Sequence, residues 1–282
     1  MNTSDAFPVR TLAADLSAGF PLRWFDGDAF RSHLFNAMSM SFPVGEQSFI
    51  DSVLGAARLL PKTPEHASLH ATIRDFAAQE SAHSNMHKVY NAQLERHGLV
   101  NRWQHWSTRL IALGERRGIG AMDKLAVTAA FEHYTALLAD MLLRHPDMMR
   151  GASPLMQALW CWHAVEETEH KAVAFDLYAT LGGGYARRMR WYLYATINFI
   201  GMATCQTLLN LKRDRSLLRS AVWFSAARFL LGRQGLVWHA AGPMLAYLRP
   251  GFHPWQQDNR ALATKWLAEN SGRYRVLRHS NR

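Results

Sequence analysis

The residues between Trp160 and His170 combine metal-binding side chains with the spacing of a buried helix face. Positions on this face recur at steps of three or four residues: Leu159, His163, Glu167, His170, Ala174, Leu177 and Leu181. Such steps keep every member on one side of an α-helix. Two histidines and a glutamate therefore interrupt a stripe that should face the core. A buried carboxylate needs a partner, and a metal ion is one of the few that suit glutamate and histidine together.

Three other predicted helices carry the same kind of interruption. Glu46 lies on the stripe of residues 44–60, Glu80-x-x-His83 on that of residues 64–97, and Glu132 on that of residues 122–144. The order Glu, Glu-x-x-His, Glu, Glu-x-x-His is the ligand arrangement of ferritin-like di-iron and di-manganese proteins. We therefore predict a dinuclear metal site whose ligands are Glu46, Glu80, His83, Glu132, His163, Glu167 and His170. The alternative is a set of buried ion pairs and capped carboxylates.

Charge supports the metal interpretation, because four carboxylates balance two divalent ions and would repel one another without them. His163 and His87 stack one turn from predicted ligands, so each is either a ligand or a residue that orients one. Gln79 and Glu166 are candidates for orienting the histidine rings, although a plain ion pair or solvent exposure suits Glu166 equally. Tyr134 lies either near the site or in the core.

The elements that must position these groups are all helical. We expect an irregular lead-in over 1–24, a ferritin-like helical bundle over 25–183, a C-terminal helical region over 184–272 packed on it, and a basic tail over 273–282. The bundle helices are predicted at 27–41, 44–60, 64–97, 103–117, 122–144 and 154–181. Ser153-Pro154 opens the last, Gly98 closes the third, and Gly182 follows the last. Further helices are predicted at 191–209, 216–233, 236–248 and 258–271, and no segment alternates long enough to predict a sheet.

Composition limits the class of protein. The chain has 282 residues, of which 49% are hydrophobic, enough for a substantial core. Two cysteines, Cys161 and Cys205, are too few for a disulfide framework or a thiolate metal site, so a reducing compartment is expected. The N-terminal stretch carries Asp5 and Asp15 without an apolar core, unlike a secretory signal. These features predict a cytoplasmic protein.

The distribution of charge along the chain indicates which partners the protein could bind. The net charge is +10, with basic clusters at residues 187–190 and 212–219 and in the tail. Such clusters suit an acidic protein, anionic lipid or nucleic acid, or are simply a solvated face. No nucleic-acid motif accompanies them. The apolar run 191–209 between two basic clusters predicts a buried or partner-covered helix, with peripheral membrane contact through 185–215, a bilayer span or a homodimer face as alternatives.

Three motifs resemble the bacterial family of predicted metal-dependent hydrolases: Gln79-Glu80-x-x-His83-x₃-His87, Trp162-His163-x₂-Glu166-Glu167-x-x-His170-Lys171-x-Val173-Ala174-Phe175-Asp176, and Phe252-His253-Pro254-Trp255. The resemblance covers residues 35–270. The ligand string with its additional His163 is also similar to that of the di-iron arylamine N-oxygenases. The chain departs from the Asp-Glu-x-Arg-His motif of many ferritin-like proteins, because Gln79 and Glu166 replace the aspartate and Ala82 and Glu169 replace the arginine.

Three functions follow from such a site. The one we expect first is an O₂-activating di-iron oxidase or oxygenase that acts on a small or apolar organic substrate, with electrons from an external donor. The second is a hydrolase that uses a dinuclear site. The third is a non-catalytic iron-binding or ferroxidase protein. Two iron ions are the expected cofactor; manganese or a mixed pair is an alternative, and zinc suits the site less well.

Overall fold

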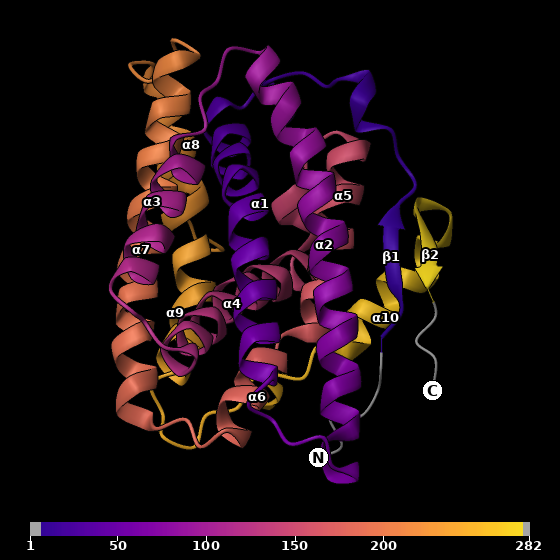
Figure 1. The fold of residues 1–282 in the computed structure, drawn as a ribbon. Coiled ribbons are helices and arrows are strands. Elements are labelled where there is room, and N and C mark those ends of the chain that lie inside the picture. The colour runs from indigo at the N-terminus through magenta and orange to yellow at the C-terminus, as the bar shows by residue number, and fades with distance from the viewer. Residues whose placement is uncertain (1–6, 279–282) are drawn as a thin grey trace.

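A computed structural model describes residues 7–278 and consists almost entirely of α-helices (Figure 1). The helices are α1 (Ala29–Ala57), α2 (Ala67–Arg96), α3 (Arg102–Arg116), α4 (Ala121–Arg144), α5 (Pro154–His170), α6 (Val173–Thr180), α7 (Tyr185–Arg213), α8 (Ser220–Leu231), α9 (Leu236–Ala246) and α10 (Arg260–Glu269). Short 3-10 turns cover Leu16–Ala18, Pro64–His66, Pro146–Met149, Pro254–Gln256 and Ser271–Arg273. The all-α prediction is confirmed.

Helices from both halves of the chain build a shared core. α1 packs against α2 and α7, and α4 packs against α5 and α7. One cluster of buried side chains includes Phe35 of α1, Trp160 of α5 and Ala240 of α9. A second joins Phe76 of α2 to Tyr192 of α7. The C-terminal helices therefore complete the hydrophobic core around the bundle.

Several predicted helix ends are confirmed. The hydroxyl of Ser153 accepts the backbone N–H of Met156, and Pro154 occupies the first turn of α5. Gly98 and Gly182 follow α2 and α6 with φ of +83° and +77°, a conformation that favours glycine. α7 is longer than predicted, because both basic flanks continue the helix. No helix within residues 7–278 combines the length and hydropathy needed to cross a bilayer.

The prediction of two helices separated at Pro43 is wrong, because α1 continues through this proline. Proline lacks the N–H that would bond to the carbonyl of Ser39 one turn earlier. Nδ2 of Asn91, on α2, donates to that carbonyl instead, at 2.9 Å. Asn101 Nδ2 donates to the next carbonyl, that of Met40, at 2.8 Å. Two side chains from outside the helix thus satisfy the backbone that the proline frees.

We expect Asn91→Leu to destabilise the metal-free protein by about 1–3 kcal/mol, because the buried Ser39 carbonyl and hydroxyl each lose a partner. Urea unfolding followed by circular dichroism measures the change. Pro43→Ala restores an N–H for the carbonyl, so the same substitution should cost less in that background. Equal costs in both backgrounds would contradict this account of the proline.

The predicted helix 154–181 is also wrong in one respect, since it breaks at Lys171-Ala172 into α5 and α6. The ammonium of Lys171 is buried and donates to the carbonyl of Gln257 at 2.6 Å and to Asn259 Oδ1 at 2.8 Å. His253 Nε2 and Asp176 Oδ1 pair at 2.7 Å. The segment after α9 therefore binds residues on both sides of the break, Lys171 and Asp176.

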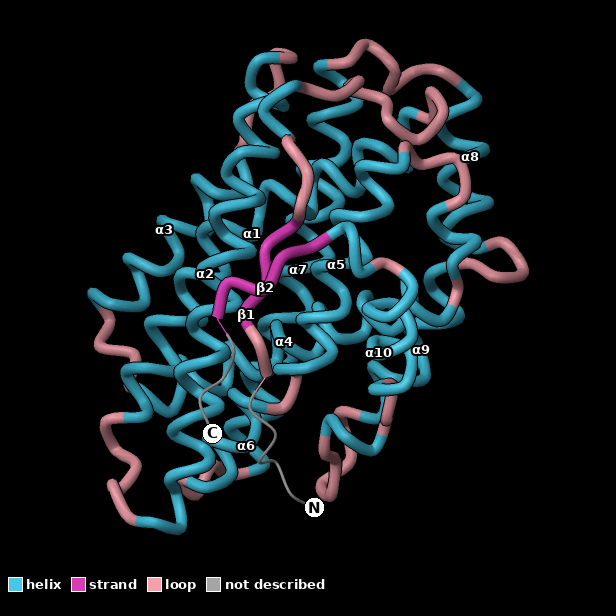
Figure 2. The backbone as a smooth tube through the Cα atoms, turned by 90° about the vertical axis from the view of Figure 1, so that its right-hand side faces the viewer, coloured by secondary structure: helices cyan, strands magenta, loops and turns pink. Residues whose placement is uncertain are grey.

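A two-stranded sheet corrects the prediction of an irregular lead-in and a plain basic tail. β1 (Val9–Leu12) pairs antiparallel with β2 (Tyr274–Arg278), with a register irregularity between Val9 and Arg10. Figure 2 shows the pair lying across the helices on the side that faces the viewer. The pairing joins the two ends of the described chain and places Arg10 against α5. Residues 1–6 of the predicted lead-in and 279–282 of the predicted tail lie outside the described residues.

Candidate metal centre

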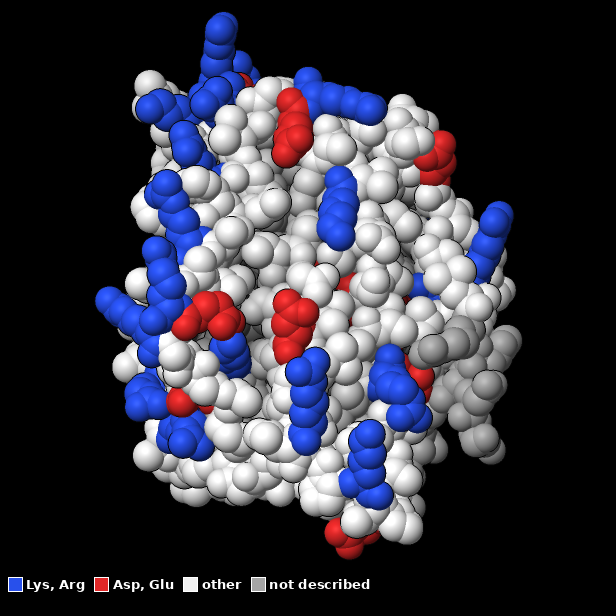
Figure 3. Space-filling view, in the orientation of Figure 1, with Lys and Arg blue, Asp and Glu red and all other residues white. Residues whose placement is uncertain are grey.

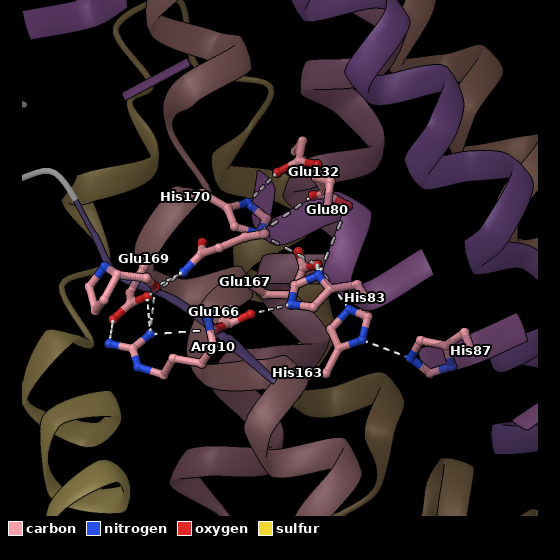
Figure 4. Close-up of polar contacts among 12 residues, drawn as sticks. Arg10, Glu80, His83, His87, Glu132, His163, Glu166, Glu167, Glu169 and His170 are labelled. Atoms are coloured by element: carbon pink, nitrogen blue, oxygen red, sulfur yellow. Dashed lines mark hydrogen bonds and ion pairs between the residues drawn. The ribbon is translucent and has the colours of Figure 1, made fainter. Parts of the chain in front are cut away.

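The predicted ligands converge from α1, α2, α4 and α5 on one buried region between the helices. Figure 4 shows those of α2, α4 and α5. α1 supplies Glu46, and α4 supplies Glu132. α2 and α5 supply the remaining members at helical spacing: Glu80, His83, His87, His163, Glu167 and His170. None of these side chains is more than 4% exposed. Local periodicity thus puts each group on its inner face, and packing of the four helices brings the faces together.

The first cluster contains Glu80, His83, Glu167 and His170, each with one donor atom within 4.8 Å of the others. His83 Nδ1 lies 3.7 Å from Glu167 Oε1. His170 Nε2 lies 3.4 Å from Glu80 Oε1. Donor atoms about 2.1 Å from one ion lie about 3–3.5 Å apart in common coordination geometries. These spacings are therefore close to those of a formed site.

The second cluster contains Glu46, His87 and His163, again within 4.8 Å of one another. The two clusters are adjacent, because Nε2 of His163 lies 2.9 Å from Oε1 of Glu167 in the first. The imidazoles of His83 and His163 stack with their centroids 4.2 Å apart. Together the clusters place donors around two neighbouring positions for cations, although hydrogen bonds to Ser39 and His163 occupy both ring nitrogens of His87.

Unpaired buried atoms mark where the cations would lie. These donor atoms find no hydrogen-bond partner among residues 7–278: both carboxylate oxygens of Glu46 and Glu80, Nδ1 of His83, Oε1 of Glu132, Oε2 of Glu167 and Nε2 of His170. Each such atom costs about 1–3 kcal/mol when left unpaired. Carboxylate oxygen and imidazole nitrogen suit iron, manganese and zinc. The donor set therefore fits the expected metal ions.

A hydrogen-bond chain determines which nitrogen of His163 faces the centre. Since Asn91 Nδ2 donates to Ser39 O, its Oδ1 accepts the Ser39 hydroxyl at 2.8 Å. The Ser39 oxygen then accepts Nδ1–H of His87 at 2.9 Å, and Nε2 of His87 accepts Nδ1–H of His163 at 2.8 Å. Nε2 of neutral His163 is left with a lone pair facing Glu167. Two acceptors at 2.9 Å repel unless a proton or a cation lies between them.

His83 is oriented by a second chain, which starts in β1. Nε2–H of His83 donates to Oε2 of Glu166 at 2.9 Å, so its Nδ1 lone pair faces the first cluster. Oε1 of Glu166 accepts the backbone N–H of Arg10 at 3.1 Å. The Arg10 guanidinium binds both oxygens of Glu169, at 2.8 and 2.9 Å. Such partners fix the tautomer and ring orientation of metal-binding histidines.

One expectation about neighbouring residues needs correction. Gln79 does not orient a histidine, because its amide donates to the carbonyl of Pro8 at 3.0 Å and to Glu169 at 2.9 Å. Glu166 does orient a histidine, through Nε2 of His83, and it is buried rather than exposed to solvent. Arg10 was missed altogether, since an isolated arginine ahead of the first helix gives no periodic signal.

Glu132 and Tyr134 differ in role although both lie on α4. Glu132 Oε2 pairs with Nδ1 of His170 at 3.2 Å, outside the two clusters but in contact with the first. The hydroxyl of Tyr134 shares a hydrogen bond with Thr196 of α7, and its ring stacks on Tyr192. Tyr134 is therefore a core residue, the second of the two alternatives.

Burial and mutual repulsion control ionisation of the carboxyl groups. Burial raises the pKa of Glu46 and Glu80 well above the usual range, and the carboxylates of Glu132 and Glu167 raise it further. Burial raises the pKa of Glu132 to about 7, although bonding to His170 opposes the rise. Burial also opposes ionisation of Glu167, but its neighbours, first the charge of His170, outweigh it and lower the pKa.

The pKa values of the histidines are also shifted in opposite directions. Burial lowers the pKa of His83 and His87 well below the usual value, and neighbouring imidazoles lower it further. Burial also acts against the charge of His170, but Glu167 and Glu132 raise its pKa to about 9. The metal-free centre therefore holds protons that divalent ions would displace.

The fold and this centre define an all-α protein with a buried carboxylate–imidazole site suited to metal ions. Comparison with protein families makes the assignment specific: the model of the family described as predicted metal-dependent hydrolases matches residues 8–258, and the chain belongs to this family. The resemblance seen in the three motifs is thus confirmed. Searches of the curated proteins and of the solved structures found no significant match.

Proposed function

We propose that the protein is a metal-dependent hydrolase that works through a dinuclear centre held by Glu46, Glu80, His83, Glu132, His163, Glu167 and His170. One observation carries the proposal: two donor clusters meet at the 2.9 Å contact between His163 and Glu167, and their inward atoms lack partners. The family match favours hydrolysis over the O₂ activation that the ligand pattern led us to expect first. The ligand order supports a ferritin-like arrangement of α1, α2, α4 and α5.

Two divalent ions held there would supply Lewis-acid polarisation of a substrate and activation of water. The protein's own residues prepare the site for them. Glu166 holds the Nε2 proton of His83, and His87 holds the Nδ1 proton of His163, so both rings present lone pairs to the centre. Phe42, packed 4.6 Å from the ring of His87 and 4.7 Å from that of His163, restricts water around the second cluster.

A second function, O₂ activation by two iron ions, is favoured by the depth of the centre. With every donor residue at most 4% exposed, a small apolar molecule reaches the site more readily than a polar ester. Tight aromatic packing around the histidines, by Phe76, Trp160 and Trp162, suits the same chemistry. This function needs an external electron donor and a small or apolar organic substrate.

Metal analysis and turnover distinguish the two functions. The full-length protein is loaded anaerobically with zinc, manganese or iron(II), and bound metal is counted by mass spectrometry. Hydrolysis of nitrophenyl ester and phosphodiester substrates with two bound ions per chain, abolished in Glu80→Gln, supports the proposal. Absence of hydrolysis with every metal, together with O₂ consumption and a near-UV absorption band by the iron form, would overturn it in favour of the second function.

A further inference from the structure

We propose that the outer apolar face of α7, α8 and α9 docks on the surface of an anionic lipid bilayer. This inference is independent of the proposed reaction. The face consists of large apolar side chains that the fold leaves in solvent: Leu193, Ile197 and Ile200 of α7, Leu218 of the following loop, Trp223, Phe224 and Leu231 of α8, and Trp238 and Leu245 of α9. Phe224 is 71% exposed and Leu218 is 96% exposed. Exposed apolar surface on this scale marks an interaction site.

Hydrogen bonds tie α9 to both α7 and α8. α9 runs antiparallel beside α7, because the hydroxyl of Tyr192 donates to the carbonyl of Met244 and that of Tyr185 to the carbonyl of Leu248. A four-residue turn joins α8 to α9, and Trp238 Nε1 donates to the carbonyl of Leu231 across it. Leu193, Ile197 and Ile200 follow one side of α7 at steps of four and three residues.

The charge around the apolar face indicates which kind of partner docks on it. Residues 185–257 contain ten arginines and lysines and a single acidic residue, Asp214, which is already paired with Arg23 and His33. Exposed members include Lys212, Arg213, Arg215 and Arg219 around Leu218. Figure 3 shows basic side chains gathered along the left edge, where Figure 1 has α3 and α7. A second copy would bring two such basic surfaces together, whereas anionic headgroups neutralise them.

A basic cleft beside α8 adds an independent observation. It has a volume of about 520 Å³, and its lining includes four arginines, Arg31, Arg150, Arg228 and Arg233, against two acidic residues, Asp28 and Asp147. Asp147 pairs with Arg150. Arg228 lies one helical turn from both Phe224 and Leu231, so it borders the cleft and the apolar face at once. An anionic headgroup in the cleft would leave its acyl chains over the apolar side chains. Arginine rimming aromatic and aliphatic residues is typical of helices that lie in a membrane surface.

The test is flotation of the metal-loaded, full-length protein with phosphatidylcholine vesicles, with and without phosphatidylglycerol. We expect binding only to the anionic vesicles, and weaker binding at high ionic strength. Phe224→Glu combined with Leu245→Glu should weaken binding about tenfold or more, and Arg228→Glu by about tenfold. Leu59→Glu, at a site 58% exposed outside this face, and Lys265→Glu, on α10, are the matched controls and should bind as the unmodified chain does.

Metal content and thermal unfolding of each variant show that the fold is retained. Equal binding to neutral and anionic vesicles, or equal losses in the controls, would overturn the proposal. A dimer in light scattering that the Phe224→Glu, Leu245→Glu variant dissociates would assign the face to a second copy instead. Binding of an acidic polypeptide without any vesicle binding would assign it to a protein partner, and also overturns the lipid proposal.

Discussion

Glu80→Gln is expected to leave the protein folded but to weaken metal binding by a factor of about 100 or more. Both oxygens of Glu80 are buried without a hydrogen-bond partner, and its raised pKa means that the metal-free protein already carries a neutral carboxyl group there. Glutamine reproduces the size and neutrality of that group but cannot supply a negative ligand. Loss of residues that only orient ligands costs 10–100-fold in affinity, and loss of a ligand should cost more.

Titration with manganese or zinc, followed by calorimetry, measures this affinity. Glu269→Gln, on the exposed side of α10, is the control and should bind as tightly as the unmodified chain. Glu166→Gln should give an intermediate loss, because it weakens the support of His83 without removing a ligand. Unchanged metal content in Glu80→Gln would show that the first cluster is an ion-pair network and not a metal site.

The convergence of the candidate ligands was partly predictable, because helical periodicity is a local property. Once residues 154–170 form a helix, His163, Glu167 and His170 must share a side, and the same holds for Glu80 and His83 on α2. Only the meeting of four such sides requires the tertiary fold. The three family motifs indicate which residues belong together but not the distances between them.

The residues that orient the histidines were not predictable, because their contacts join distant parts of the sequence. Arg10 lies 156 residues from Glu166, and Asn91 lies 52 residues from Ser39. Neither contact leaves a pattern in its own segment. Gln79 was a candidate because it directly precedes Glu80. Successive side chains on a helix point in directions about 100° apart, so the side chain of Gln79 points away from that of Glu80.

Local signals also failed where tertiary contacts override them. Pro43 ordinarily ends a helix, but Asn91 and Asn101 supply the missing hydrogen bonds. The break at Lys171 has no glycine or proline to mark it. It coincides with a buried ammonium that the distant Gln257 and Asn259 hold. The short β1–β2 pair depends on joining the two ends of the described chain, which no single segment reveals.

Removal of the metal ions is expected to make stability fall as pH rises from 6.5 to about 9. In this range the unfolded chain has lost its carboxyl protons, and its histidines pass from half-protonated at the lower end to neutral. The folded, metal-free centre still binds protons, because the pKa of Glu46 and Glu80 is raised by burial and that of His170 reaches about 9. A state that binds more protons loses stability relative to the other as pH increases.

His170 alone contributes on the order of 3 kcal/mol to this loss, from the difference between about 9 and its ordinary 6.5. His83 and His87 oppose it only slightly, because their lowered pKa values affect stability mainly below pH 6.5. Bound ions take the place of the protons, so the metal-loaded protein should vary little over the same range. At a free metal concentration about a thousand times Kd it should also be more stable by about 4 kcal/mol.

Urea unfolding at pH 6.5 and pH 9, with chelator and with metal, measures both effects. Glu80→Gln is the matched variant: without metal its stability should fall less steeply with pH, because one of the retained protons is gone. With metal it should resemble the chelated protein more than the loaded one. If the chelated, unmodified protein were equally stable at both pH values, the buried carboxyl groups would have to be ionised and paired, and the charge balance that calls for two cations would be lost.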